Sequence, residues 1–208
     1  MEQVTRPNAG EPGGRLQPAR PPLPAPDAAR VQVVLLPGFG YGPDKPLLYY
    51  AAKVARQKGR TVTALRYTAL AARDTPEARA QDSLPGALAD AEAQILPGFD
   101  RYVLVAKSFG TLVAGLWAAR RPKAAVTLLQ LTPLPQGYET VYRGVPAFHA
   151  TGTADPLSGP EFRRRLAADP AIELLVVPGG NHSLDTPPDY AAGLQALQTL
   201  VALYRARL

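Results

Sequence analysis

The feature of the sequence that most constrains its fold is a short apolar strand that turns into a helix at a serine. The strand covers residues 102–107, Ser108 follows it, and the helix runs over residues 111–119. A turn this tight requires small side chains two residues before and two residues after the serine, where Ala106 and Gly110 stand. Such a turn lifts the hydroxyl above the carboxyl end of the sheet. Because a serine hydroxyl is a weak nucleophile until a positioned base takes its proton, the chain must also supply that base.

An acid and a histidine follow two later strands. Strand 146–151 leads to Asp155, and strand 172–177 leads to His182. The sequence has two histidines, and the other one, His149, lies inside a strand, where we expect a core residue with its ring hydrogen bonded or a residue supporting the site. His182 is therefore the candidate base, and Asp155 is the candidate acid that orients it.

Each of these residues also has an ordinary structural interpretation. Ser108 alone could be the N-cap of a helix, Asp155 alone could be a turn residue, and His182 alone could lie in a surface loop. Asp185 is a further carboxylate near His182, and we interpret it as a turn or capping residue before two prolines. Taken together, the three residues indicate a catalytic site, because each follows a predicted strand.

Serine, acid and histidine in this chain order resemble the α/β-hydrolase superfamily, in particular its small lidless members of the esterase or dienelactone-hydrolase type. The resemblance covers residues 31–208. It implies a catalytic triad of Ser108, Asp155 and His182, a covalent acyl-enzyme, and no metal or organic cofactor. Two histidines and no cysteine also leave few ligands for a zinc site.

The resemblance further implies an oxyanion hole built from backbone amides. One donor is the amide that follows the nucleophile, which here belongs to Phe109. The other comes from the glycine-containing loop 37–42 after the apolar strand 31–36. We assign it to Phe39, with Gly40 as the alternative.

Strands and helices alternate from residue 31 onward, which predicts an α/β fold: a three-layer α/β/α sandwich around a mostly parallel sheet of about six strands. The first helix is expected to open with Asp44 as its N-cap and to end at Gly59. The remaining expected elements are strand 61–65, helix 84–95, strand 125–131 and a last amphipathic helix ending near residue 208. Residues 1–30 are rich in proline and arginine, and we expect them to form a disordered leader.

Four side chains are candidates for the substrate pocket. The segment 132–145 lies where related hydrolases carry a lid, and it is too short for a separate cap domain. We therefore expect an open or lightly covered site, with Tyr138 or Tyr142 at its rim, although a plain connector is an equal alternative. Tyr41 lies in the glycine-containing loop 37–42. Lys107 precedes the nucleophile and could attract an anionic acyl group or anchor a nearby acidic group. Equally, it could pack its stem behind the turn with its charge in solvent.

The composition excludes several other classes of function. The net charge of +6 comes from scattered basic residues, and the three arginines at 163–165 point in different directions around a helix, so we expect no nucleic-acid partner. The sequence has no apolar run of membrane-spanning length and no signal-peptide pattern at its start, so we expect no membrane partner and a cytoplasmic location. The oligomeric state stays open.

The predicted function is a serine hydrolase that cleaves a small acyl ester, thioester or lactone. Two alternatives stay open at this point. A peptidase or amidase of the same fold would use the same groups, and a non-catalytic binding or scaffold protein could have this fold without the chemistry.

Overall fold

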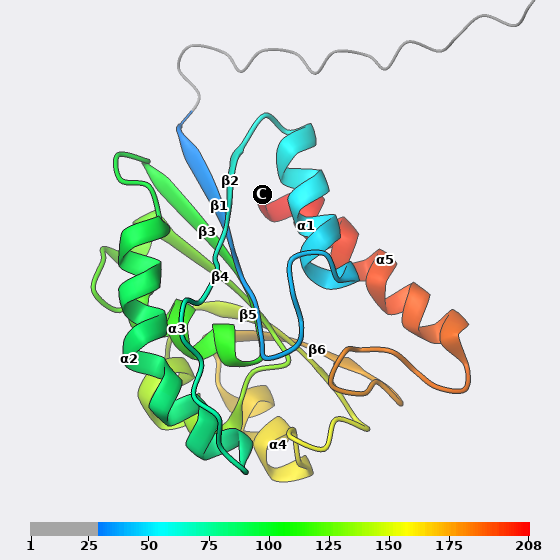
Figure 1. Cartoon of the computed structure of the whole chain (residues 1–208). Helices are drawn as coiled ribbons and strands as arrows, with labels where there is room; N and C mark the ends of the chain where they lie inside the picture. The colour runs from blue at the N-terminus through cyan, green and yellow to red at the C-terminus, as the bar shows by residue number, and fades with distance from the viewer. Residues whose placement is uncertain (1–28) are drawn as a thin grey trace, which may run out of the picture.

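The computed structural model describes residues 29–208, which form a six-stranded parallel sheet between two layers of helices (Figure 1). The strand order is β2-β1-β3-β4-β5-β6, and every neighbouring pair is parallel. The strands are β1 (Val31–Leu36), β2 (Thr61–Ala64), β3 (Arg101–Lys107), β4 (Val126–Leu131), β5 (Ala147–Gly152) and β6 (Ile172–Val177). The predicted α/β sandwich with a parallel sheet of about six strands is therefore confirmed. The expected leader falls almost entirely on residues 1–28, which lie outside the described residues.

Helices cover both faces of the sheet (Figure 1). Helices α1 and α5 lie on one face, and α2, α3 and α4 lie on the other. The five helices are α1 (Pro46–Gln57), α2 (Pro76–Gln94), α3 (Phe109–Ala118), α4 (Pro160–Ala168) and α5 (Tyr190–Arg207). Three short helical turns complete the chain: η1 (Lys123–Ala125), η2 (Pro135–Gly137) and η3 (Tyr138–Tyr142).

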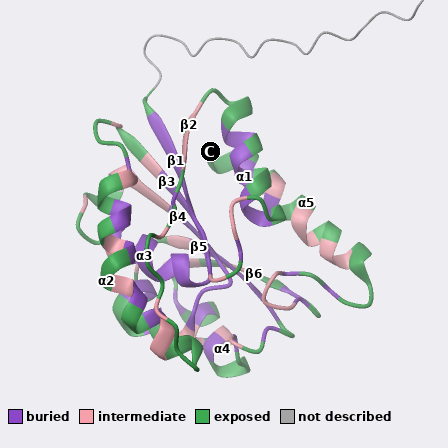
Figure 2. Ribbon diagram, in the orientation of Figure 1, coloured by how far each residue is buried: buried purple, intermediate pink, exposed green. Residues whose placement is uncertain are grey.

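Because the central strands are covered on both faces, their side chains are buried on both sides (Figure 2). Successive residues of a strand point to opposite faces. Val103 and Val105 of β3 accordingly pack under α1 and α5, whereas Leu104 and Ala106 pack under α2 and α3. This burial explains why β1 and β3 are continuous apolar runs rather than alternating ones.

The strand order reverses between β1 and β3, and this reversal creates the place for a site. The chain passes from β1 to β2 on one side, and then returns to β3 on the other side of β1. The loops that leave the carboxyl ends of β1 and β3 therefore diverge and leave a crevice between them. The loop 37–42 and Ser108 follow these two strands.

The start of α1 differs from the prediction. Its N-cap is Lys45, with no side-chain hydrogen bond, and Asp44 lies one residue outside the helix. A residue before proline favours extended backbone, and Lys45 precedes Pro46 with φ −82° and ψ 151°. Extended backbone is the geometry of an N-cap, so the proline sets the boundary in place of the aspartate.

Helix α2 begins eight residues before its predicted start at residue 84. The Thr75 hydroxyl caps it by accepting a hydrogen bond from the Ala78 amide over 3.2 Å. Pro85, which resembles a helix start in the sequence, lies inside the helix. Proline has no N–H to donate to the carbonyl of Gln81, one turn earlier. Both residues lie on the exposed side of the helix, so solvent can bind this carbonyl instead. The predicted strands 61–65 and 125–131 differ from the observed ones by one residue at one end, and the predicted strand 146–151 is displaced by one residue at both ends.

None of the helices in the described part of the chain combines the length and apolar character that a membrane crossing requires.

Candidate active site

Ser108 lies in a strained turn between β3 and α3. Its backbone has φ 52° and ψ −119°, a conformation that a residue with a side chain rarely adopts. Two close backbone approaches enforce the turn. A Cβ atom on Gly110 would overlap the carbonyl oxygen of Leu36, and one on Gly38 would lie 2.9 Å from the Cβ of Ser108. The Ser108 amide also donates to the Leu131 carbonyl over 2.9 Å, so the turn is held from both neighbouring strands.

The loops after β5 and β6 are joined to each other by their backbones. A Cβ atom on Gly152 would overlap the carbonyl of Gly180, so only glycine permits this approach. The Ala154 amide donates to Gly180 over 2.9 Å, and the Thr153 amide donates to Val177 over 3.0 Å. These contacts fix the segment that carries Asp155 against the segment that carries the histidine.

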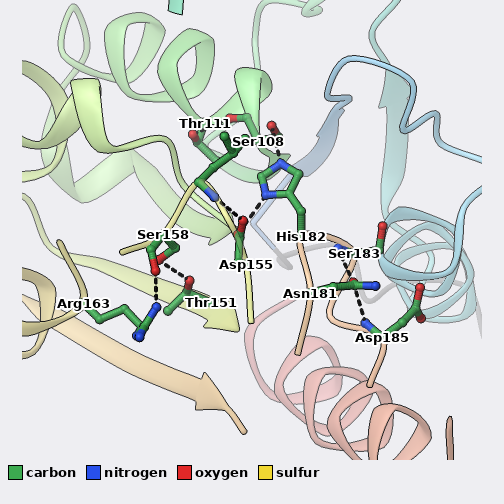
Figure 3. A network of polar contacts seen from close by, with 11 residues as sticks. Ser108, Thr111, Thr151, Asp155, Ser158, Arg163, Asn181, His182, Ser183 and Asp185 are labelled. Atoms are coloured by element: carbon green, nitrogen blue, oxygen red, sulfur yellow. Dashed lines mark hydrogen bonds and ion pairs between the residues drawn. The ribbon is translucent and has the colours of Figure 1, made fainter. Parts of the chain in front are cut away.

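The three predicted catalytic side chains form one continuous hydrogen-bonded chain (Figure 3). The His182 Nε2 atom lies 2.8 Å from the Ser108 hydroxyl, and its Nδ1 atom lies 2.8 Å from Asp155 Oδ2. The other Asp155 oxygen accepts from the Leu157 amide over 2.9 Å. The Asp155 side chain is fully buried, so its charge acts on the imidazole without solvent screening. With Nδ1–H donated to this carboxylate, Nε2 is an acceptor aimed at the serine proton.

The histidine loop is closed by Asn181. Its side-chain oxygen accepts from the amides of Ser183, over 2.8 Å, and Asp185, over 3.1 Å. The carboxylate of Asp185 is exposed and lies away from the His182 ring in Figure 3. Asp185 therefore has a turn position, as its sequence suggested, whereas the N-cap of α5 is Asp189.

The acid loop is anchored to α4. The Thr151 hydroxyl donates to the Ser158 hydroxyl over 2.7 Å, and the Arg163 guanidinium donates to the Ser158 carbonyl (Figure 3). Thr151 and Ser158 are fully buried. This network holds both ends of the Asp155 loop.

The loop 37–42 folds back so that the ring of Phe39 lies on the ring of Phe109, the residue after Ser108. Gly38 and Tyr41 exchange two backbone hydrogen bonds of 3.2 Å, and Gly40 takes the positive φ of 68° that this turn needs. The rings of Phe39 and Phe109 stack with their centroids 4.4 Å apart. Among the hydrogen bonds of residues 29–208, none has the Phe39, Gly40 or Phe109 amide as donor. The three candidate amides are thus unpaired within the described residues.

Two residues that the sequence analysis did not single out contact the stacked rings of Phe39 and Phe109. The edge of Tyr67 contacts Phe109 at a centroid distance of 5.4 Å, and the Tyr67 hydroxyl donates to the Pro37 carbonyl. The guanidinium of Arg79 lies 4.2 Å from the centre of the Phe39 ring. Tyr67 comes from the loop after β2 and Arg79 from the first turn of α2, and no local motif marks such long-range contacts.

Lys107 and Tyr41 do not line an open site. Lys107 is fully buried, and its ammonium lies 4.9 Å from the centre of the Tyr41 ring. Burial lowers the pKa of Lys107 to about 7, against the opposing effect of the Asp155 charge. The Tyr41 hydroxyl accepts from the Leu47 amide over 3.1 Å. The buried ammonium faces neither solvent nor an open pocket, whereas the charge of Asp155 acts on it, in line with the third alternative, a nearby acidic group.

Tyr138 and Tyr142 are also turned away from the predicted rim. The Tyr138 hydroxyl donates to the Arg165 carbonyl over 3.1 Å, and the Tyr142 hydroxyl lies 2.7 Å from the Thr111 hydroxyl. Both side chains are buried in the core between α3 and α4. The segment 132–145 is thus a packed connector, which was the alternative interpretation.

His149 is a core residue, as expected, but its ring is not hydrogen bonded. It lies on β5 opposite Gln130 of β4, and both side chains are fully buried. Within residues 29–208 none of their four side-chain nitrogen and oxygen atoms has a hydrogen-bond partner. Burial lowers the pKa of His149 to about 3, so the ring is neutral at physiological pH.

In the described part of the chain, no three His, Asp or Glu side chains gather as a metal site would require.

No family model matches the sequence, and no curated protein matches it. The fold, however, matches many solved structures. A provisionally assigned hydrolase of the α/β superfamily from Xanthomonas campestris pv. campestris is 22% identical, with a TM-score of 0.62, over 86% of this chain and 99% of the other. A lidless α/β serine hydrolase from Xanthomonas campestris is 22% identical, with a TM-score of 0.55, over 88% and 86%. An α/β serine hydrolase homologue from Coxiella burnetii is 15% identical, with a TM-score of 0.57, over 86% and 88%. The chain has the α/β-hydrolase fold.

Proposed function

We propose that this chain of α/β-hydrolase fold is a serine hydrolase that cleaves small acyl esters, thioesters or lactones through an acyl-enzyme. The observation that carries the proposal is the hydrogen-bonded chain from the buried Asp155 through His182 to Ser108. A serine at a strained turn, bonded to a histidine whose other nitrogen faces a buried carboxylate, has the geometry of an activated nucleophile.

The reaction would proceed in two halves. The His182 Nε2 atom takes the Ser108 proton as the hydroxyl oxygen attacks the acyl carbon, and Asp155 stabilises the imidazolium that forms. The amides of Phe39 and Phe109 donate to the oxyanion. His182 then gives its proton to the leaving oxygen. In the second half, water repeats the attack and releases the acid.

The unpaired amides add a second line of support. A buried or half-buried amide without a partner costs free energy, and such donors are kept where a ligand accepts from them. Phe39 and Phe109 carry such amides on two segments that are stacked by their own rings. Removing one donor of this type from a hydrolase costs about 100- to 1000-fold in rate.

The proposal is tested by hydrolysis of 4-nitrophenyl acetate. Wild type should show a burst of nitrophenol equal to the enzyme concentration if deacylation is slower than acylation, followed by steady turnover. Ser108→Ala and His182→Ala should lose at least about 1000-fold in kcat/KM with the fold unchanged. Thr199→Ala removes an exposed hydroxyl on α5 and serves as the control that keeps full activity. Full activity in Ser108→Ala would contradict the proposal.

A further inference from the structure

Helix α2 and the segment before it bring two side chains onto the stacked rings of Phe39 and Phe109. Tyr67 contacts the Phe109 ring edge to face, and Arg79 lies over the Phe39 ring, 4.2 Å from its centre. Helix α2 follows β2 and begins at the carboxyl edge of the sheet, the edge to which the loop 37–42 belongs (Figure 1). Both contacts therefore fall on the two residues that carry the candidate oxyanion amides.

The segment 66–71, which carries Tyr67, is tied to α2 by side-chain hydrogen bonds of 2.7–3.1 Å. Two of the α2 side chains that form these bonds, Ser83 and Asp90, are buried, so water does not compete for them. Tyr67 and Arg79 are thus fixed relative to each other. The bonds join Arg66 to Gln94, Thr68 to Asp90, and Ala71 to Ser83.

This unit holds the loop 37–42 at two points. The Tyr67 hydroxyl donates to the Pro37 carbonyl over 3.2 Å, where the loop begins. Two residues farther on, the Phe39 ring contacts both the Phe109 ring and the Arg79 guanidinium. Because a side chain occupies staggered rotamers, rotation of the Phe39 backbone would carry its ring out of this stack. The position of the ring therefore restricts the direction of the Phe39 amide.

The charge of Arg79 has no other protein partner among residues 29–208. No ion pair of these residues includes it, and its Nε atom is buried without a hydrogen bond. The side chain as a whole is half-buried. Since a cation gains more from an aromatic ring when it is partly desolvated, the Phe39 ring is the main partner of this guanidinium within the described residues.

We propose that Arg79 is a positioning residue: its guanidinium holds the Phe39 ring in the stack and thereby keeps the Phe39 amide directed at the oxyanion. The inference rests on the proposed esterase function, with Phe39 as one of the two oxyanion donors. Both halves of that reaction pass through an oxyanion at the same amides. Loss of Arg79 therefore slows acylation and deacylation together, so kcat falls while KM, which depends on the ratio of the two rates, stays nearly constant.

The test measures the hydrolysis of 4-nitrophenyl acetate, with thermal melting as the check that each variant is folded. Arg79→Ala should lose about 10-fold in kcat, less than the ~100-fold that loss of a whole oxyanion donor costs. Arg79→Lys keeps a cation near the ring and should recover part of this loss. Arg121→Ala removes another arginine from an aromatic ring, that of Trp117 beyond the far end of α3, and should keep the wild-type kcat.

A double-mutant cycle tests whether Arg79 acts through the ring. Phe39→Ala removes the ring and keeps the amide. In the Phe39→Ala background, Arg79→Ala should have no further effect on kcat, because the guanidinium has lost its contact. An undiminished 10-fold loss in that background would overturn the proposal, and so would a wild-type kcat in Arg79→Ala alone.

A pair of substrates separates positioning from direct binding of an anionic substrate. Arg79→Ala should lower kcat equally for ethyl butyrate and for monoethyl succinate, which carries a carboxylate. A loss confined to the succinate ester would show that the guanidinium binds the substrate, and would overturn the positioning role. Fluorophosphonate labelling of Ser108 is measured on the same samples. A labelled and active wild type with an equally active Arg79→Ala refutes the positioning role alone, whereas a wild type that neither reacts with the probe nor turns over refutes the proposed function.

Discussion

Replacing the buried Lys107 with methionine should stabilise the protein at neutral pH and remove a specific part of its pH dependence. Lys107 is fully buried beside the Tyr41 ring, and its charged form has lost its hydration. Methionine has a similar length and no charge to desolvate. The gain should be largest at low pH, where the lysine is protonated, and should shrink as the pH rises.

The magnitude follows from the two pKa values of Lys107. The side chain titrates near 10.5 in the unfolded chain and at about 7 in the folded one, so between these values the unfolded state binds more protons. The free energy of unfolding then rises with pH, by up to about 1.4 kcal/mol per pH unit. Between pH 7.5 and pH 9.5 this amounts to roughly 2 kcal/mol for wild type. The Lys107→Met variant lacks this increment.

Urea unfolding at pH 7.5, 8.5 and 9.5 measures the difference, with fluorescence of the single and buried Trp117 as the signal. The range stops below pH 10 because burial raises the pKa of Tyr204 and of other core tyrosines, which would add a slope of opposite sign. Lys53→Met removes an exposed lysine of α1 and should keep the wild-type slope. Equal slopes in wild type and Lys107→Met would show that Lys107 is not held in a dry environment, and would refute the reasoning.

Four further changes test the turn, an exposed position of α2 and the core. Ser108→Gly should be about 1 kcal/mol more stable than the equally inactive Ser108→Ala, since glycine accepts a φ of 52° without strain, and it should therefore melt at a higher temperature. Equal melting temperatures would argue against strain. Gly110→Ala should destabilise the protein by about 3 kcal/mol or more in chemical unfolding, because its Cβ overlaps the Leu36 carbonyl. Gly86→Ala, on the exposed side of α2, should instead stabilise it by about 1 kcal/mol. On acidification from pH 6 to pH 4, His149 should lower the free energy of unfolding of the wild type by up to about 1.4 kcal/mol per pH unit. The reason is that the unfolded histidine takes up a proton, whereas the folded one, with its pKa lowered to about 3, does not. His149→Phe should lack this contribution. An unchanged acid slope in this variant would mean that the ring is protonated in the fold.

The sequence predicts the sheet and the three polar residues at its edge because their signals are local. A tight turn needs small neighbours, so Ala106 and Gly110 mark Ser108 in the chain itself. The acid and the histidine each follow a strand whose apolar run is also local. Since carboxyl ends of parallel strands share one edge, the three groups could be placed together before any contact was known.

Contacts between distant segments left no such signal. Tyr67 contacts Phe109 edge to face, and the Arg79 guanidinium lies over the Phe39 ring. Only the folded chain brings these residues within reach of one another. The start of α2 was missed because Pro85 resembles a helix start, and its tolerance depends on lying on the exposed side.

Lys107 shows how a charged residue type can mislead. At the end of β3 it shares its face with Val103 and Val105, and this alternation carries it under α1 and α5 into the core. Its charge favoured an exposed or substrate-facing position in the sequence. The strand period proved the better guide, because the backbone fixes the direction of a side chain whatever its polarity.

The most direct test of the central claim is labelling with a small fluorophosphonate, read by intact mass, on wild type and Ser108→Ala. An activated serine attacks phosphorus and keeps the adduct, whereas an ordinary hydroxyl does not react. The account predicts one adduct on wild type and none on Ser108→Ala. Folded wild type without an adduct, or an adduct that persists in Ser108→Ala, would contradict it.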